Sequence, residues 1–298
     1  MIRPVHFGFN AETAVNNAFQ VAGADAAAQE KAEREFDEFV HLLRRNGVNV
    51  LVVNDTPEPH TPDSIFPNNW ISFHDEGAAV LYPMFAANRR AERKPQVLEA
   101  LKEQFNIKET IDLSDYENKD LFLEGTGSMV LDRDHKIAYA CLSPRTHKEV
   151  LNEFCKKMQY KPILFTAIDA SGKPVYHTNV MMCVADRYAV ICLESIASQP
   201  ERELVAATLH QSGKELIDIS MEQMNRFAGN MLQVQNNKGE KILVMSGQAY
   251  ASLTEKQLNK LSSLNRIVHA PLNTIETNGG GSARCMMAEI FLEIKNKK

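Results

Sequence analysis

The chain has 298 residues and a formal net charge of −5, with 44% hydrophobic and 24% charged residues. So small a net charge argues against a protein whose main work is to neutralise nucleic-acid phosphates or anionic lipid. No segment approaches the ~20 apolar residues of a membrane span, and residues 1–20 carry no signal-peptide pattern, so we expect a cytoplasmic protein.

Helical and strand-like patterns alternate along the chain. A long helix is predicted over Ala26–Arg45, ended by Asn46-Gly47, and the strand Val48–Val53 follows it. Beyond it, helical spacing of apolar residues predicts four more helices, each followed by a strand-like run. The helices are Ala91–Phe105, Pro144–Gln159, Pro200–Ser212 and Thr254–Leu264, and the strands are Ile107–Leu113, Pro162–Thr166, Glu215–Ile219 and Arg266–Ala270.

Five further segments read as β-hairpins, each a polar or glycine cluster followed by two apolar runs around a turn. They begin at Pro67, Glu124, His177, Gly229 and Gly281. Their anchor residues Asn69, Thr126, Thr178, Asn230 and Ser282 are spaced by 57, 52, 52 and 52 residues. The repeat predicts five hairpin–helix–strand units in a closed ring, in which the C-terminal hairpin joins the N-terminal helix and strand. The alternative is an ordinary α/β domain with evenly spaced elements.

Reactive side chains cluster where the hairpins begin. If the units are related by rotation about one axis, these positions meet at the centre. There a thiol, an imidazole and a carboxylate would form the set needed for nucleophilic catalysis. The residues concerned are Asn68, Asn69, Glu124, His177, Asn179 and Cys285.

Cys285 is the candidate nucleophile because of its sequence surroundings. It follows the run Asn278-Gly279-Gly280-Gly281-Ser282, which permits close backbone approach and offers N–H donors. The other four cysteines, at 141, 155, 183 and 192, lie in apolar runs and are expected to be structural. A structural role is the alternative for His177 and Glu124 too. No metal-binding or nucleotide-binding spacing occurs, so we expect no metal.

Together these motifs resemble the guanidine-modifying (pentein) superfamily, and most closely its citrulline-utilisation hydrolase and amidinotransferase branch. The motifs are Pro67-Asn68-Asn69, Glu124-Gly125-Thr126-Gly127-Ser128, His177-Thr178-Asn179, the glycine-rich approach to Cys285 and the opening segment 7–20. The resemblance covers essentially the whole chain, residues 1–298, as a single catalytic domain. It implies a five-bladed α/β propeller, a covalent adduct on Cys285, His177 as general acid/base, Glu124 as its acidic partner, and no cofactor.

The sequence departs from the arginine-acting members at two positions. Where those enzymes resemble one another in having aspartates that hold the guanidinium, this chain has Asn69 and Asn179. Two carboxylates suit a cation, whereas an amide offers both a donor and an acceptor. We therefore expect a neutral ureido substrate, citrulline, in preference to arginine.

In the expected reaction the Cys285 thiolate attacks the ureido carbon, and the Gly279–Gly281 backbone or the asparagine amides stabilise the charge on oxygen. His177 protonates the departing nitrogen and then activates water, and an adjacent imidazolium or the substrate favours the thiolate. Asn68, Asn69, Asn179 and Arg284 are the candidate substrate-binding residues; Arg145 and Arg90 are further candidates for the substrate carboxylate.

Three alternatives to citrulline hydrolysis stay open. The first is transfer to an amine acceptor, as in an amidinotransferase, and the second is deiminase-like action on arginine. The third is a catalytically idle binding scaffold. In each case we expect a small-molecule ureido or guanidino ligand and neither nucleic acid nor membrane as a partner, with a homo-oligomer left open.

Overall fold

Four three-stranded sheets of one design make up most of the computed structural model, which describes residues 1–21 and 27–295. In each sheet two strands form an antiparallel pair and a third strand, later in the chain, pairs parallel to the second. The sheets are β3 (Ile71–Phe73), β4 (Ala78–Leu81) and β5 (Glu109–Asp112); β6 (Val130–Asp132), β7 (Ile137–Cys141) and β8 (Lys161–Phe165); β9 (Met182–Val184), β10 (Tyr188–Ile191) and β11 (Glu215–Asp218); β12 (Leu232–Gln235), β13 (Lys241–Ser246) and β14 (Arg266–Ala270).

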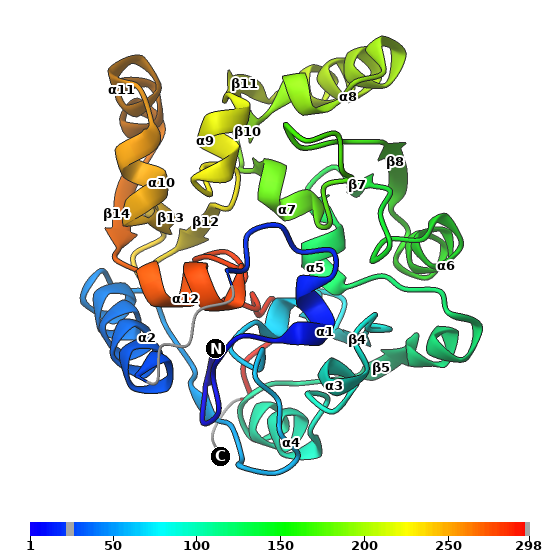
Figure 1. Cartoon of the computed structure of the whole chain (residues 1–298), viewed down its shortest axis with the longest axis vertical. Helices are drawn as coiled ribbons and strands as arrows, with labels where there is room; N and C mark the ends of the chain where they lie inside the picture. The colour runs from blue at the N-terminus through cyan, green and yellow to red at the C-terminus, as the bar shows by residue number, and fades with distance from the viewer. Residues whose placement is uncertain (22–26, 296–298) are drawn as a thin grey trace.

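A helix connects the second and third strands of each of these sheets, because a parallel pair needs a crossover connection. These helices are α4 (Pro95–Gln104), α6 (Lys148–Met158), α8 (Gln199–Gln211) and α11 (Glu255–Leu264). Two of these helices have side-chain caps at their starts: Thr254 and Gln257 form a capping box at α11, and the Ser198 side chain caps α8. Figure 1 shows these helices and α2 (Ala28–Arg45) around the outside of the molecule, with the sheets inside them.

The predicted α/β architecture of repeated hairpin–helix–strand units is therefore confirmed, with one difference in the fifth unit. Its sheet consists of β1 (Ile2–Arg3) paired parallel with β2 (Val53–Asn54), and α2 precedes β2. The predicted start of that helix at residue 26 lies outside the described residues. The expected C-terminal hairpin is wrong: within the described residues 281–295, the only β contact is a bridge from Ile294 to Phe105. Cys285 N–H instead donates to the Ser282 carbonyl, which turns the chain.

Short helical turns stand where the hairpins were expected to begin directly as strands. They are η1 (Pro67–Asn69), α5 (Gly125–Ser128) and α7 (Thr178–Met181), and all three lie in the central region of Figure 1. A further helix, α12 (Asn273–Gly279), immediately precedes the turn that carries Cys285. The candidate residues of the hairpin starts thus sit on backbone that turns at the centre of the ring of sheets.

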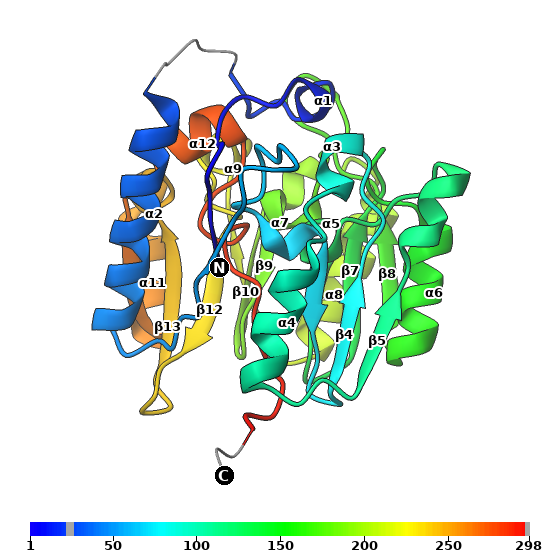
Figure 2. The ribbon, with the colours of Figure 1, turned by 90° about the horizontal axis from the view of Figure 1, so that it is seen from below.

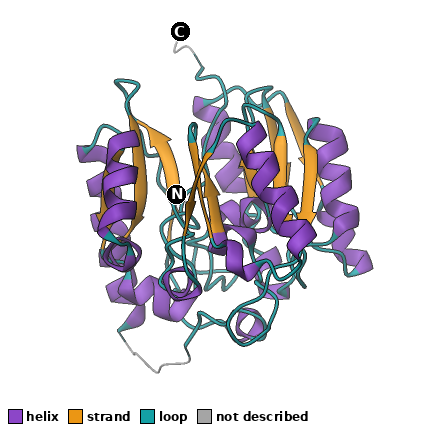
Figure 3. Cartoon of the chain, turned by 90° about the horizontal axis from the view of Figure 1, so that it is seen from above, coloured by secondary structure: helices purple, strands orange, loops and turns teal. Residues whose placement is uncertain are grey.

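The apolar core lies between the outer helices and the sheets. All five residues of β7 and all four of β10 are buried, which is why these strands read as continuous apolar runs. Figures 2 and 3 show helices on the outer side of the strands, and Figure 2 shows α1 (Ala11–Ala14) and α12 at one end of the molecule. Across residues 1–21 and 27–295, no helix combines the length and hydropathy needed to cross a bilayer.

The remaining short elements connect these units. They are α3 (Ala87–Arg90), η2 (Ser114–Lys119), η3 (Leu193–Ser195), α9 (Met221–Asn225) and α10 (Gly247–Ser252). Of these, α3 matters most for the site, since it carries Arg89 into the centre of the molecule.

Candidate active site

Cys285 is buried at the centre, 3% exposed, with two asparagine amides beside its sulfur. Its Sγ lies 3.5 Å from Asn179 Nδ2 and 3.3 Å from Asn230 Nδ2. Within the described residues, none of the other four cysteines has an asparagine amide at its sulfur, although Thr178 Oγ1 lies 3.4 Å from Cys141 Sγ. Burial raises the pKa of each of these four thiols, and for Cys155 and Cys183 the pKa reaches about 12. A thiol is inert in that state, and of the five cysteines Cys285 is the one that lines the central cavity.

Glu124 and His177 form a buried hydrogen-bonded pair. His177 Nε2 lies 2.7 Å from Glu124 Oε2, and the same carboxylate accepts from Phe85 N–H at 3.0 Å and lies 3.4 Å from Arg145 Nη1. Burial by itself would raise the pKa of Glu124, but Arg145 and His177 outweigh it and hold the pKa well below its usual range. Glu124 is therefore an anion that accepts the Nε2–H of the imidazole.

The His177 imidazole is neutral around pH 7. Burial lowers its pKa to about 4, although the hydrogen bond that the imidazole donates to Glu124 acts in the opposite direction. Since Nε2 carries the proton toward Glu124, Nδ1 is left as an acceptor. Nδ1 faces Gly127, where an added Cβ would lie only 2.8 Å from it and 2.3 Å from Asn69 Nδ2. The glycine keeps clear the space next to both nitrogens.

Three asparagine side chains in this region carry buried polar atoms without a hydrogen-bond partner. In the described part of the chain, these atoms are Asn68 Oδ1, Asn69 Nδ2 and Asn179 Oδ1. The other polar atom of each amide has a hydrogen-bond partner; for example, Arg89 Nη1 donates to Asn69 Oδ1 at 2.8 Å. Of the three, Asn69 lines the cavity and Asn179 lies beside Cys285 Sγ, whereas the expected Asn68 is not part of the cavity lining. Buried polar groups are rarely left unpaired, so the free donor of Asn69 and the free acceptor of Asn179 indicate a bound polar ligand.

A cavity of about 10 Å³ lies at this centre, with room for about one water molecule. Its lining combines the expected Asn69, Arg145, His177, Cys285 and Gly279–Gly281 with Thr13, Asn17, Asp63, Phe66, Arg89 and Tyr176. The N-terminal segment around α1, which lies at the top of the molecule in Figure 2, contributes Thr13 and Asn17 to this lining. The same segment occupies Arg145, which donates to the Thr13 carbonyl at 2.7 Å and to Asn16 Oδ1 at 2.6 Å.

The sequence of the glycine run indicated free backbone N–H donors, but the backbone groups of Gly280 already have hydrogen-bond partners within the protein. Gly280 ends α12 with a φ of 63°, and its N–H donates to the Glu276 carbonyl. Its carbonyl accepts from Tyr176 Oη at 2.6 Å and from Asn17 Nδ2 at 3.3 Å. The Gly280 N–H is therefore not a spare donor for a substrate oxygen, and the asparagine amides are better placed for that task.

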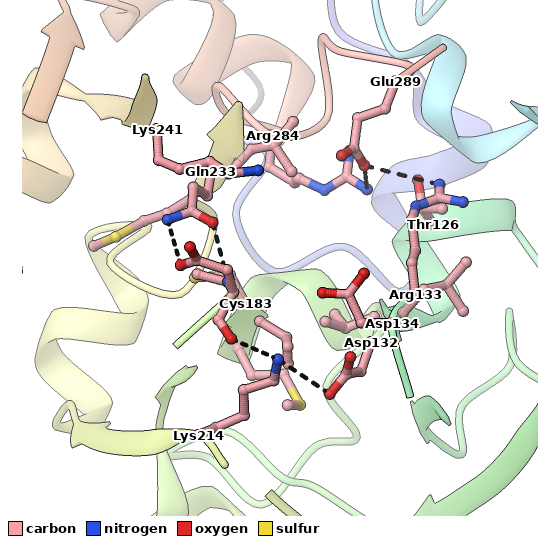
Figure 4. Close-up of a pocket in the computed structure, with 18 of the residues that line it drawn as sticks. Thr126, Asp132, Arg133, Asp134, Cys183, Lys214, Gln233, Lys241, Arg284 and Glu289 are labelled. Atoms are coloured by element: carbon pink, nitrogen blue, oxygen red, sulfur yellow. Dashed lines mark hydrogen bonds and ion pairs between the residues drawn. The ribbon is translucent and has the colours of Figure 1, made fainter. Parts of the chain in front are cut away.

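Arg284 is not brought to this cavity. Its guanidinium donates to the Met287 carbonyl at 2.9 Å and to Glu289 at 3.3 Å, and Figure 4 shows it directed toward Glu289. It lines a separate cavity of about 150 Å³ that also contains Lys214 and Asp132, an ion pair at 3.4 Å. Consecutive residues on the turn point to opposite sides, so Cys285 faces one cavity and Arg284 the other.

Three residues of the site, Arg89, Asp63 and Asn230, were not predicted from the sequence, and Arg90 was predicted in place of its neighbour Arg89. Arg90 pairs with Glu117 at 3.7 Å, whereas Arg89 lines the cavity and holds the buried Glu92 at 2.8 Å. Asp63, whose Oδ1 has no partner within the described residues, carried no motif. Asn230 is an anchor residue of the repeat, as Asn69 is. This equivalence was the signal in the sequence that could have placed Asn230 at the centre.

Residues 3–292 match the family described as N,N dimethylarginine dimethylhydrolase, eukaryotic. The chain belongs to this family. It is thus a pentein-superfamily member, in a family of cysteine-dependent hydrolases that cleave a non-peptide C–N bond, as predicted. No curated protein is similar enough in sequence to count as a match.

Solved structures with the same fold include the N-terminal domain of ArgZ, an asparagine-to-serine variant covalently bound to a reaction intermediate. It has a TM-score of 0.74 at 18% identity over 98% of both chains. Full-length ArgZ, an arginine dihydrolase from the ornithine–ammonia cycle in cyanobacteria, has a TM-score of 0.75 at 18% identity; the match covers 97% of this chain and 40% of ArgZ. A dimethylarginine dimethylaminohydrolase adduct with S-methyl-L-thiocitrulline has 0.65 at 14% identity over 96% of both chains.

Proposed function

We propose that this chain, acting as one catalytic domain, hydrolyses the C–N bonds of a ureido amino acid and converts citrulline to ornithine, ammonia and carbon dioxide. The observation that carries the proposal is the orientation of Asn69. Arg89 has only donors and takes Asn69 Oδ1 at 2.8 Å, so the free atom of the amide is the donor Nδ2. A donor requires an acceptor on the ligand. A ureido oxygen is such an acceptor, and a guanidinium has none.

The remaining free atoms complement the rest of citrulline. Asn179 Oδ1 is an acceptor and suits a ureido N–H. Asp63 offers an unpaired carboxylate oxygen, while Arg145 contributes a cation from the same cavity. One carboxylate and one guanidinium are the groups that recognise an α-ammonium and an α-carboxylate.

In the first half of the proposed reaction, the Cys285 thiol proton moves to His177 Nδ1 and the sulfur bonds to the ureido carbon. Asn69 Nδ2 donates to the oxygen as its negative charge develops. As the C–N bond breaks, the electron pair leaves with the nitrogen, and His177 returns the proton to it. Glu124 stabilises the imidazolium through Nε2–H while it carries both protons.

In the second half, a water molecule gives a proton to His177 and its oxygen attacks the carbon of the S-adduct. The C–S bond breaks, and the thiol is regenerated as His177 returns the proton. The remaining nitrogen departs as ammonia or as the ornithine amine, and the carbon leaves as carbon dioxide. One water is consumed for each citrulline.

Substrate entry requires the N-terminal segment to move. A cavity of about 10 Å³ cannot hold an amino acid, and the Arg145 guanidinium is taken by Asn16 and the Thr13 carbonyl. A substrate carboxylate would replace these partners on Arg145. Segments that cover a site and open for substrate are common in enzymes.

Arginine is the second candidate substrate, and Asp63 is the observation that favours it. Its buried carboxylate has a free oxygen, which also suits a guanidinium. The two candidates differ in stoichiometry, because citrulline yields one ammonia for each ornithine whereas complete hydrolysis of arginine yields two.

The test is an ammonia and ornithine assay over citrulline, arginine, methylarginines and agmatine, with and without glycine as an acceptor. We expect one ammonia for each ornithine from citrulline, no glycine adduct, and no turnover by Cys285→Ala. Turnover of arginine with none of citrulline would refute the argument from Asn69. A glycine adduct would indicate transfer, and inertness toward the whole panel would favour a binding scaffold.

A further inference from the structure

Asn230 enters the site from the fourth repeat, immediately before β12, and its amide is oriented by three contacts. The Arg284 N–H donates to Asn230 Oδ1 at 3.0 Å. One hydrogen of Nδ2 is directed to the Asn179 carbonyl at 3.0 Å and the other to Cys285 Sγ at 3.3 Å. The side chain is 1% exposed. The amide cannot flip without leaving a buried donor and a buried acceptor unpaired.

Cys285 therefore has amide donors on two sides, from Asn230 and Asn179. An amide N–H interacts more strongly with a thiolate than with a thiol, because a hydrogen bond to a charged acceptor is the stronger kind. The pair of donors thus favours the ionised sulfur.

These two amide donors matter because the positive charges that line the cavity are already paired with carboxylates. The imidazole of His177 is uncharged near pH 7 because burial lowers its pKa to about 4, so no imidazolium stands ready to stabilise a thiolate. A guanidinium substrate would bring a positive charge to the sulfur, but a ureido substrate brings none. Arg89 and Arg145 line the cavity but are paired with Glu92 and Glu124.

We propose that Asn230 is a catalytic residue that, with Asn179, stabilises the Cys285 thiolate through hydrogen bonds and so replaces the charge that a neutral substrate does not bring. The inference rests on the proposed role of Cys285 as the nucleophile. The other titratable or charged groups that line the cavity are Asp63, Arg89, Arg145, Tyr176 and His177, and Arg284 adjoins Cys285 in the chain. All of them are retained in the variants below.

The test measures the rate of iodoacetamide alkylation against pH in the full chain, read by mass spectrometry on the peptide that contains Cys285. Asn230→Ala should raise the pH at which alkylation is half-maximal by about one unit, which is a tenfold loss of thiolate at a given pH. Asn230→Asp has the same shape and keeps the oxygen that accepts from Arg284 N–H. Its carboxylate should raise the midpoint further, because it repels the thiolate.

Asn265→Ala is the matched control. Asn265 is also buried and hydrogen-bonded, to Tyr188 Oη at 2.6 Å and to the Leu261 carbonyl at 2.9 Å, but it does not contact the sulfur. It should destabilise the fold and leave the alkylation midpoint unchanged. If Asn230→Ala does not fold, the isosteric Asn230→Asp decides the matter.

An unshifted midpoint in folded Asn230→Asp would overturn the inference. Alkylation needs no substrate, so the two proposals fail separately. A protein inert toward citrulline with a shifted midpoint refutes the proposed function and supports the role of Asn230. If the protein hydrolyses citrulline but the midpoint is unshifted in folded Asn230→Asp, the proposed function is supported and the role of Asn230 is refuted.

Discussion

Replacement of Asn69 by aspartate is the sharpest test of substrate choice. Asn69→Asp keeps the shape of the side chain and the oxygen that accepts from Arg89 Nη1 at 2.8 Å. It converts the free donor Nδ2 into a second acceptor with a negative charge. The ureido oxygen then loses its donor, while a guanidinium gains a charged partner.

The magnitude follows from the role of that donor. Removal of one donor to an oxygen that becomes charged in the transition state costs about 10²–10³ in kcat, or about 3–4 kcal/mol. A charge-assisted hydrogen bond to a guanidinium contributes about 1.5–3 kcal/mol, roughly tenfold to a hundredfold. The kcat/KM ratio of citrulline to arginine should therefore fall by about 10³–10⁵ in the variant.

The assay is ornithine release from each substrate at steady state, with the melting temperature recorded for each protein. Asn237→Asp is the matched control, since it adds the same charge on the exposed turn between β12 and β13. It should leave the ratio unchanged. A folded Asn69→Asp protein that keeps its activity on citrulline within a few-fold would refute the assignment of Nδ2 as the donor to the ureido oxygen.

Three further predictions concern the other groups of the site. Glu124→Gln keeps the shape but removes the charge that orients His177, so kcat for ornithine release should fall about 10³–10⁴-fold while the protein stays folded; a fall of less than tenfold would contradict the role. Gly127→Ala places a Cβ 2.3 Å from Asn69 Nδ2 and should abolish turnover, whereas unchanged kinetics would mean that this space is not used. Because burial lowers the pKa of His177 to about 4, the unfolded chain takes up the proton at higher pH than the folded protein does. The free energy of unfolding should therefore decline as pH falls from about 6.5 to 4, by at most about 1.4 kcal/mol per unit from this group, and His177→Gln should flatten that decline in urea titrations.

The regular part of the fold could be predicted because its signals are local. Period and caps placed α6, α8 and α11 and the strands that follow them within a few residues of their observed bounds. The C-terminal hairpin was predicted wrongly, since apolar residues near 285–294 pack against other units instead of pairing with each other. Leu292 is buried in one cluster with Ile2 and Phe105, which are distant in sequence.

Of the candidate site, only the residues at equivalent positions of the repeat could be predicted from the sequence. Equivalent positions indicated that Glu124, His177 and Cys285 lie at one centre, and the structure brings all three there. Arg89 and Asp63 escaped because they lie outside the hairpin starts, and their approach depends on how α3 packs. Asn230 had the right position, but the start of the fourth hairpin carries no thiol, imidazole or carboxylate beside it.

The charges of the site explain why the asparagines carry so much of the proposed chemistry. Each guanidinium near the reacting centre is already paired, Arg89 with Glu92 at 2.8 Å and Arg145 with Glu124 at 3.4 Å, and these ions are nearly or fully buried. A buried pair is costly to break, because one partner would be left uncompensated. The free groups closest to the sulfur are therefore amides, which form hydrogen bonds in both directions without carrying charge. A neutral substrate attacked by a thiolate held between amide donors is the chemistry that such an arrangement favours.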